Sequence, residues 1–393
     1  MRAVYHRFLM SVLADRLQGP TRARPPATER IQPRRSTMPY TAVQFIGYEI
    51  YTGPGHNPDR YVGLDSDRDD IAARIALMKE ALTAAKASPL IATDPGVLKV
   101  FMAPEFYFRG KQGAYPIELL TGTGPNPDPL SLIGGLSALI ADASWQDWLV
   151  VFGTAIAGSV NAARQTEVYN VSYVQKGGFR NETERLGKCV VIMKEFMSGI
   201  DFLAITAAGL TNTDVAHLAG VGPGTYALEQ NNPGQAGGGG YNGGSIFLMD
   251  NITFGLEVCL DHDQRRLLRA WPARGDPFIQ LQLVPSGGMT INTCAVATLG
   301  GGLIFNVDGL MNFGVGGGYG YHTDLRWVRR RLPGNADLLP LPAVGLIWVN
   351  QDRAALTQVF WLPPDNDLYN VAARTPNLII YAPAVIPQPL LAQ

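Results

Sequence analysis

Three apolar runs of this chain each end in, or contain, a reactive polar residue. VLKVFMAPEF (97–106) has Glu105 next to its end, CVVIMKEF (189–196) contains Lys194, and ITFGLEVCLDH (252–262) contains Cys259. Short runs of β-branched and aromatic residues predict buried strands. A charged side chain is costly to bury unless it is paired. We therefore expect these three side chains at the ends of strands, where they can meet.

The three side chains together suit one kind of chemistry. A carboxylate can take the proton of a thiol, and the resulting thiolate can attack a carbonyl or nitrile carbon. An ammonium group can stabilise the negative charge that then develops. The set therefore predicts thiol-based acyl transfer.

The rest of the chain alternates between strand-like and helix-like segments. Helical spacing of apolar residues predicts helices at 65–87 and 129–142 and a short helix in QRRLLRAW (264–271). Other strands are expected at 41–50, 97–103, 148–157, 168–174 (as a hairpin arm), 244–249 and 278–284, with further candidates in GLIFNV (302–307), VGLIWVN (344–350), LTQVFWL (356–362) and NLIIYA (377–382). This alternation indicates an α/β protein. Periodicity alone does not choose between a sandwich and a doubly wound sheet.

Three short blocks resemble those of the nitrilase, or carbon-nitrogen hydrolase, superfamily. They are APEF (103–106), MKEF (193–196) and EVCLDH (257–262), which carry Glu, Lys and Cys in the family's chain order. Each block alone is a weak signal, but the ordered triple is fairly specific. The resemblance implies a four-layer αββα sandwich of the nitrilase type, with two sheets face to face and helices outside.

The resemblance also implies roles for individual residues. Cys259 would be the nucleophile, and Glu105 would take its proton and later activate the hydrolytic water. Lys194 would orient both residues and bind the oxyanion, with the backbone N–H of Leu260 as a second donor. Tyr107, Phe108, Arg109 and Ser286 are candidate pocket walls, with core packing as the alternative for the aromatic residues.

Two features depart from the family pattern. Many members carry a second Glu after the Lys, whereas this chain has KEFMSGID; Asp201 is a weaker candidate for that role, with Glu195 or no residue as the alternatives. The Gly-rich stretch 221–244 lengthens the separation between Lys194 and Cys259, and it lacks the Gly-Lys-Ser/Thr ending of a phosphate loop. His262 lies three residues after Cys259, and we expect it to support the site or lie at the surface rather than act as the base.

Composition narrows the class of protein. The chain has 393 residues, 46% of them hydrophobic and 17% charged, with a net charge of -1, so nothing indicates nucleic acid as a partner. Residues 1–38 hold eight Arg and many Pro, and we expect a disordered arm there, followed by one hydrolase domain at 39–393. Three Cys (Cys189, Cys259 and Cys294) make a disulfide framework improbable and favour a reducing, cytoplasmic compartment. No run is apolar enough for a membrane span, and no pattern predicts a metal or cofactor.

We therefore expect hydrolysis of a non-peptide carbon-nitrogen bond in an amide, carbamoyl or nitrile substrate through a cysteine thioester. Amide substrates are favoured by analogy with the superfamily. The alternatives are transfer to an amine acceptor, and an assembly protein with an impaired triad. The resemblance also implies a homodimer or higher homo-oligomer. The apolar residues after 376 would reach across to a partner, or else fold back on their own chain.

Overall fold

The computed structural model describes residues 39–53, 61–121, 131–160, 166–194, 196, 245–270, 279–310, 322–332, 334–360 and 375–387. Within these ranges the strands form a nine-stranded and a six-stranded sheet. The larger sheet runs in the order β13 (Ala343–Trp348), β14 (Asn377–Tyr381), β1 (Ala42–Glu49), β2 (Val97–Met102), β4 (Trp148–Val160), β5 (Thr166–Lys176) and β6 (Cys189–Met193), with β3 (Tyr115–Pro116) and β15 (Ala384–Val385) attached to it. The smaller sheet runs β12 (Asn335–Pro340), β11 (His322–Leu332), β10 (Leu303–Asp308), β9 (Leu281–Ser286), β8 (Ile252–Leu256) and β7 (Ile246–Met249). The protein is thus of the mixed α/β class.

Each sheet has a parallel centre with antiparallel flanks. The parallel strands are β1, β2 and β4 in the larger sheet and β8, β9 and β10 in the smaller one. β5 pairs antiparallel with β4, which confirms the predicted hairpin arm. The carboxyl ends of parallel strands lie at one edge of a sheet, which is where functional residues of such sheets gather. Glu105 follows β2 and Cys259 follows β8 at these ends.

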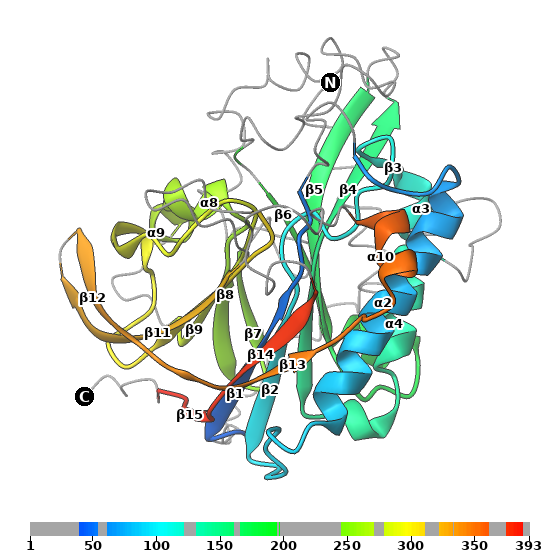
Figure 1. The fold of residues 1–393 in the computed structure, drawn as a ribbon. Helices are drawn as coiled ribbons and strands as arrows, with labels where there is room; N and C mark the ends of the chain where they lie inside the picture. The colour runs from blue at the N-terminus through cyan, green and yellow to red at the C-terminus, as the bar shows by residue number, and fades with distance from the viewer. Residues whose placement is uncertain are drawn as a thin grey trace, which may run out of the picture.

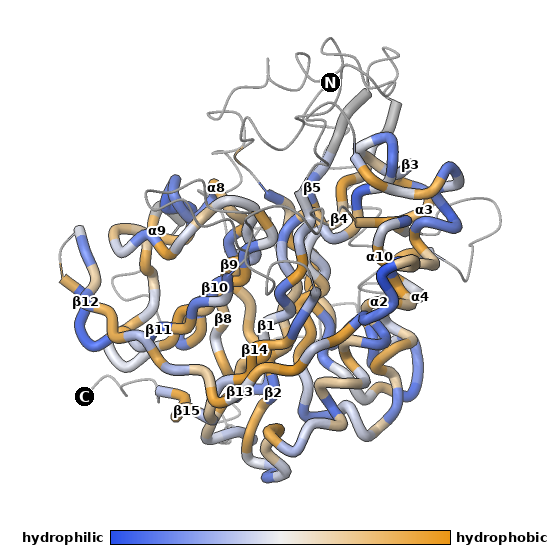
Figure 2. Tube along the Cα trace, in the orientation of Figure 1, coloured by the Kyte–Doolittle hydropathy of each residue, from blue (hydrophilic) through white to orange (hydrophobic). Residues whose placement is uncertain are grey.

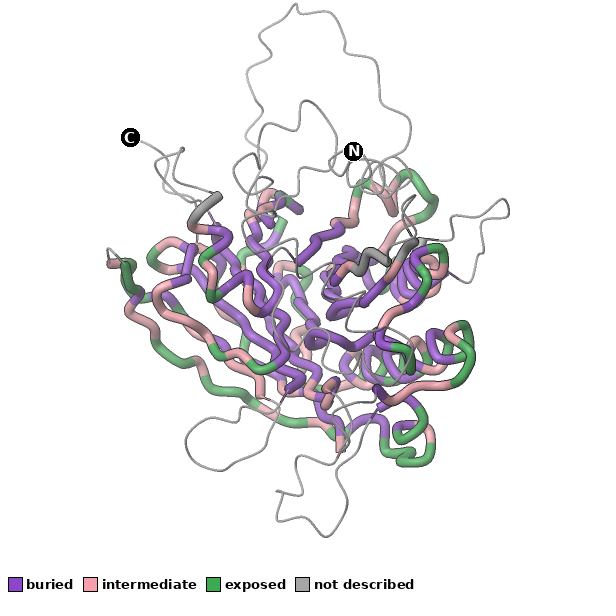
Figure 3. The backbone as a smooth tube through the Cα atoms, turned by 90° about the horizontal axis from the view of Figure 1, so that it is seen from above, coloured by how far each residue is buried: buried purple, intermediate pink, exposed green. Residues whose placement is uncertain are grey.

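The two sheets pack face to face through an apolar core. Phe45 of β1 and Phe305 of β10 meet across it, with ring centroids 4.8 Å apart. Residues next to these in the strands face the other way, because side chains alternate along a strand. The buried strand residues form the centre of the molecule in the view of Figure 3, and Figure 2 shows the strands as its most hydrophobic segments.

Helices cover the outer face of the larger sheet (Figure 1): α2 (Asp67–Ala87), α3 (Ile117–Thr121), α4 (Leu132–Leu139) and α10 (Arg353–Val359). α2 begins at Asp67, two residues after the predicted start, because Ser66 caps it: its side chain accepts a hydrogen bond from the N–H of Asp69 at 3.4 Å. Acidic residues fill its first turn and Lys86 its last, which suits the helix dipole. The smaller sheet carries the short α8 (Leu260–Asp263) and α9 (Arg266–Ala270) near its upper edge.

One predicted strand is wrong. LTQVFWL was expected as a strand, but Leu356 and Val359 lie in α10 and are buried. Asp352 caps this helix by accepting hydrogen bonds from the N–H groups of Ala354 and Ala355 at 3.0 and 3.2 Å. The apolar residues at spacing i, i+3 therefore face the core as a helix stripe. The structure also contains the β11–β12 hairpin, which was not predicted.

The segment after residue 376 folds back on its own chain. β14 pairs antiparallel with β1, and β15 pairs with the start of β1. The N–H of Ile386 donates to the carbonyl of Thr41 at 3.0 Å. Residues 377–387 therefore follow the second of the two alternatives stated for them. The arm 1–38 and the Gly-rich stretch 221–244 lie outside the described residues. Among the described helices, none is long and apolar enough to cross a membrane.

Candidate active site

Glu105 lies just beyond β2, on a loop that is fixed from several sides. Its N–H donates to the carbonyl of Ser286 at 3.3 Å, and its carbonyl accepts from Oγ1 of Thr52 at 2.5 Å. The next residue, Phe106, has a φ of 64°, and its N–H donates to Oγ1 of Thr154 at 2.9 Å. A non-glycine residue in this region of φ is uncommon. The sharp turn is therefore held by hydrogen bonds rather than by sequence preference.

Lys194 and Asn170 both donate to one oxygen of Glu105. Nζ of Lys194 lies 3.0 Å from Oε1, and Nδ2 of Asn170 lies 2.8 Å from it. Lys194 follows β6, and its N–H donates to the carbonyl of Asn170 on β5 at 2.8 Å. This backbone hydrogen bond fixes the positions of the two donors relative to each other. All three residues are buried, with 0%, 5% and 5% of Glu105, Lys194 and Asn170 exposed. A buried ion pair keeps its charges only when such hydrogen bonds accompany it.

Cys259 lies three residues beyond β8, in a tight turn before α8. Its φ is 48° and its ψ is -112°, a strained backbone for a residue with a side chain. Such strain typically costs about 1–3 kcal/mol and is often found at functional sites. The turn is closed by the N–H of Asp261 bonding Val258 O at 3.0 Å and the N–H of His262 bonding Cys259 O at 2.8 Å. The thiol is 3% exposed, and its Sγ lies 3.5 Å from the carbonyl of Gly287.

The end of β9 and the first residue after it connect Glu105 and Cys259. Pro285 O accepts the N–H of Cys259 at 3.1 Å, Ser286 O accepts the N–H of Glu105, and Gly287 O accepts the thiol. Three successive carbonyls thus contact the two reactive residues. Both residues are therefore held against one short segment, and Glu105 and Cys259 lie in one region of the molecule.

A buried ion pair joins the Cys259 turn to the Lys194 segment. Asp261 Oδ2 lies 3.1 Å from Nη1 of Arg266, and the same nitrogen donates to the carbonyl of Met193 at 2.9 Å. Oδ1 of Asp261 accepts the N–H of Phe196 at 2.7 Å. Asp261 and Arg266 therefore bond the chain on both sides of Lys194, and they fix it relative to the turn that carries Cys259.

Both ring nitrogens of His262 form hydrogen bonds with groups other than the Cys259 thiol. Its Nδ1 lies 2.8 Å from Oε2 of Glu257, and its Nε2 accepts the N–H of Asn292 at 3.1 Å. An acceptor Nε2 places the ring proton on Nδ1, where it donates to Glu257. Both side chains are fully buried. His262 therefore supports the turn, in agreement with the expectation that it does not act as the base.

The other predicted residues lie as follows. Tyr107 packs in the core between the larger sheet and α2, and its hydroxyl donates to the carbonyl of Arg74 at 3.3 Å; burial raises the pKa of this phenol. Phe108 lies on the same side of the sheet. The guanidinium of Arg109 lies between the rings of Tyr61 and Phe106, with its carbon 3.8 and 4.1 Å from their centroids. Core packing, the stated alternative for the aromatic residues, thus describes Tyr107 and Phe108.

Ser286 and Leu260 belong to the loops around the reactive residues. Ser286 is buried, and its hydroxyl donates to Asp308 at 3.0 Å, so its side chain supports the loop after β9. Leu260 is the first residue of α8, where a backbone N–H has no acceptor inside the helix. Asp201 and its alternative Glu195 lie outside the described residues.

Four residues of this region were not predicted: Asn170, Asp261, Arg266 and Asp308. Asn170 is one polar residue in the alternating run VYNVSYV, where it resembles any inward-facing polar residue of a strand. Asp261 lies in the third block and Arg266 follows four residues after its end. Their five-residue spacing does not by itself predict an ion pair.

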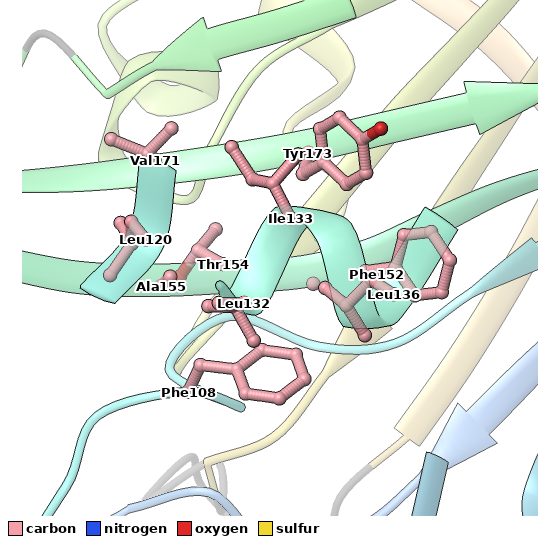
Figure 4. A pocket seen from close by; sticks show the side chains of 11 residues that line it. Phe108, Leu120, Leu132, Ile133, Leu136, Phe152, Thr154, Ala155, Val171 and Tyr173 are labelled. Atoms are coloured by element: carbon pink, nitrogen blue, oxygen red, sulfur yellow. The ribbon is translucent and has the colours of Figure 1, made fainter. Parts of the chain in front are cut away.

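A small apolar cavity lies away from these residues, on the helix side of the larger sheet (Figure 4). Its walls include Phe108, Leu136, Phe152 and Tyr173, and none of Glu105, Lys194 and Cys259 contributes to it. It is therefore a packing gap beneath α4 rather than a substrate site. In the described ranges, no three His, Cys, Asp or Glu side chains are grouped as a metal site.

No protein-family model matches the chain, and no curated protein matches it in sequence. In structure it is similar to an amidase from Nesterenkonia sp., with 16% identity and a TM-score of 0.38 over 77% of this chain and 91% of that chain. It is also similar to a mutant of the amidase from Nesterenkonia sp. AN1 in complex with butyramide, with 14% identity and a TM-score of 0.37 over 77% and 92% of the two chains. The amidase from Nesterenkonia AN1 is of the nitrilase superfamily.

A third similar structure is a glutamine-dependent NAD+ synthetase from Acinetobacter baumannii, with 13% identity and a TM-score of 0.34 over 76% of this chain and 43% of that one. Identity and TM-score are low throughout. The assignment of function therefore rests on the residues of this chain and their geometry.

Proposed function

We propose that the protein is a carbon-nitrogen hydrolase of the nitrilase type, which cleaves an amide through a thioester on Cys259. The carrying observation is that Glu105 and Cys259 are both held by Pro285–Gly287 at the end of β9, and that Glu105 pairs with Lys194 at 3.0 Å. Two facing sheets with helices outside support the four-layer αββα sandwich that the sequence blocks imply.

The first half of the reaction forms the thioester. Glu105 takes the proton of the Cys259 thiol. The thiolate attacks the amide carbon and gives a tetrahedral oxyanion. The ammonium of Lys194 and the N–H of Leu260 stabilise that oxyanion. When the carbon-nitrogen bond breaks, Glu105 returns its proton to the departing nitrogen, which leaves as ammonia or an amine.

The second half releases the acid. Glu105 removes a proton from water as the water attacks the thioester carbon, and the same two donors bind the second oxyanion. The carbon-sulfur bond then breaks, and the proton on Glu105 returns to the sulfur. One water is consumed, and the product is a carboxylic acid. The carboxyl group of Glu105 thus changes between base and acid twice in each cycle.

The fixed positions of these groups supply much of the expected rate. Because Cys259 and Glu105 are both held against Pro285–Gly287, we expect a reduced entropy cost of bringing the base to the thiol. The buried ion pair also keeps the charge of Lys194 in place before the oxyanion forms, so little rearrangement is needed. These features favour an enzyme over an assembly protein with an impaired triad.

Release of ammonia from a panel of amides, carbamoyl compounds and nitriles tests the proposal. The wild-type protein is expected to release ammonia from at least one amide. Cys259→Ala and Cys259→Ser should abolish that release with little change in the unfolding temperature, because both changes are small. Turnover within about tenfold of wild type in either variant would exclude Cys259 as the nucleophile, since loss of such a nucleophile costs many orders of magnitude. Hydroxamate formation with added hydroxylamine would reveal transfer to an amine acceptor.

A further inference from the structure

Asp308, the last residue of β10, is a fully buried carboxylate with no role in the reaction described above. It accepts hydrogen bonds from the N–H groups of Gly288, Met289 and Leu310 at 2.9, 2.5 and 2.7 Å, and from the hydroxyl of Ser286 at 3.0 Å. Burial raises its pKa, while His322, opposite it on β11, and the three N–H groups lower it. The carboxylate thus replaces its lost hydration with four protein donors.

Three of these donors belong to the loop that holds the reactive residues. Ser286, Gly288 and Met289 surround Gly287, whose carbonyl accepts the Cys259 thiol at 3.5 Å. The carbonyl of Ser286 accepts the N–H of Glu105. Asp308 therefore lies one hydrogen bond behind the contacts that the loop makes with the nucleophile and the base.

The residue after Asp308 is also connected, through Thr52, to the carbonyl of Glu105. This residue, Gly309, accepts the N–H of Thr52 at 2.8 Å, and Thr52 donates from Oγ1 to the carbonyl of Glu105. A Cβ at Gly309 would lie 2.2 Å from that Oγ1, so the two segments are in close contact. The end of β10 is therefore connected to both backbone groups of Glu105: to its N–H through Ser286, and to its carbonyl through Thr52.

We infer that Asp308 is a positioning residue for the proposed reaction, which sets the distance between the Cys259 thiol and Glu105 through the loop Ser286–Met289. This inference rests on the proposed function. An aspartate is needed because every group that faces its two oxygens is a donor. Asn has the same shape, but its NH₂ group would face N–H donors that now bond a carboxylate oxygen of Asp308. Because two donors cannot bond each other, the Asn would displace the segment Ser286–Met289.

Alkylation of Cys259 by iodoacetamide measures the effect without any substrate. Asp308→Asn is expected to lower the alkylation rate of Cys259 at least about tenfold, with the alkylation rate of Cys294 in the same sample as the reference. The same variant should lower kcat by up to about 10²-fold with less change in KM, as for a displaced reactive group. Ser286→Ala removes one donor to Asp308 and should give a smaller decrease, with an unfolding temperature close to wild type. Asp324→Asn is the matched control: this carboxylate lies on neighbouring β11 and pairs with Arg326 at 2.9 Å. It should leave the rate unchanged.

The outcomes separate this inference from the proposed function. A wild-type Cys259 that reacts no faster than Cys294 contradicts the proposed function. A fast wild-type thiol whose rate is unchanged in folded Asp308→Asn contradicts the role of Asp308. If Asp308→Asn shows no cooperative unfolding transition, Ser286→Ala decides: an unchanged alkylation rate in that variant overturns the inference.

Discussion

Lys194 Nζ and Glu105 Oε1 lie 3.0 Å apart, and both side chains are almost completely excluded from solvent. Removing one partner of such a pair leaves the other charge buried and costs about 3–5 kcal/mol. In the proposed reaction Lys194 has two roles, because it pairs with Glu105 and would stabilise the oxyanion. Changes at Lys194 must accordingly be compared with changes at a lysine that is buried but remote from the site.

Lys194→Ala should lower kcat by at least about 10²-fold, the typical effect of losing one oxyanion donor. Lys194→Arg should restore little activity, because a planar guanidinium does not replace a compact ammonium. Lys176→Ala is the control, since Lys176 is also buried and pairs with Asp250 at 2.7 Å. It should lower the unfolding temperature but not kcat. Steady-state kinetics and thermal unfolding of the three variants check this, and an active Lys194→Arg would indicate a purely structural charge.

Asn170→Ala should lower kcat by roughly ten- to a hundredfold, because a hydrogen bond to a charged group contributes about 1.5–3 kcal/mol. Ser172→Ala is a matched control two residues along β5. Ser172 is also buried, but its hydroxyl donates to the carbonyl of Gly153 at 2.9 Å. If both variants lose the same activity, Asn170 acts only through the stability of β5. The measurement is kcat with each protein well below its unfolding temperature.

His262→Asn separates Glu105 from a Cys–His dyad. We expect kcat within about tenfold of wild type, because His262 bonds Glu257 and Asn292 rather than the thiol. The unfolding temperature should fall, since an unsatisfied buried N–H at Asn292 costs about 1–3 kcal/mol. A folded His262→Asn protein as inactive as Cys259→Ala would show instead that His262 is the base.

The sequence was sufficient for the residues that end buried strands. Glu105 and Lys194 each follow a run of apolar residues, and such a run predicts both the strand and the exit of a charged side chain at its end. That Lys194 and Glu105 form an ion pair follows from the strand order β2-β4-β5-β6, which periodicity does not determine. β5 runs antiparallel to both β4 and β6, so β2 and β6 end at the same edge of the sheet. The positioning contacts of Asn170 and Asp308 depend on strand register, and a single polar residue in a strand carries no signal for its partner.

The errors in secondary structure have similar causes. Leu356 and Val359 were read as part of a strand because their local run is apolar, whereas the cap at Asp352 begins a helix. No hydrophobic run predicts the β11–β12 hairpin, because β11 is rich in Arg and both strands are partly exposed. An edge strand such as β12 lacks the hydrophobic run that identifies a buried strand.

The most direct test of the central claim is the rate at which iodoacetamide alkylates each cysteine, measured by peptide mapping in wild type and in Glu105→Gln. Burial raises the pKa of Cys189 to about 11, so at pH 8 only about one molecule in a thousand carries that thiolate. We predict that Cys259 reacts much faster than Cys189 and Cys294, and that Glu105→Gln removes this advantage while the protein stays folded. A Cys259 that reacts no faster than Cys294, or whose rate is unchanged in Glu105→Gln, would contradict the assignment of an activated nucleophile and its base.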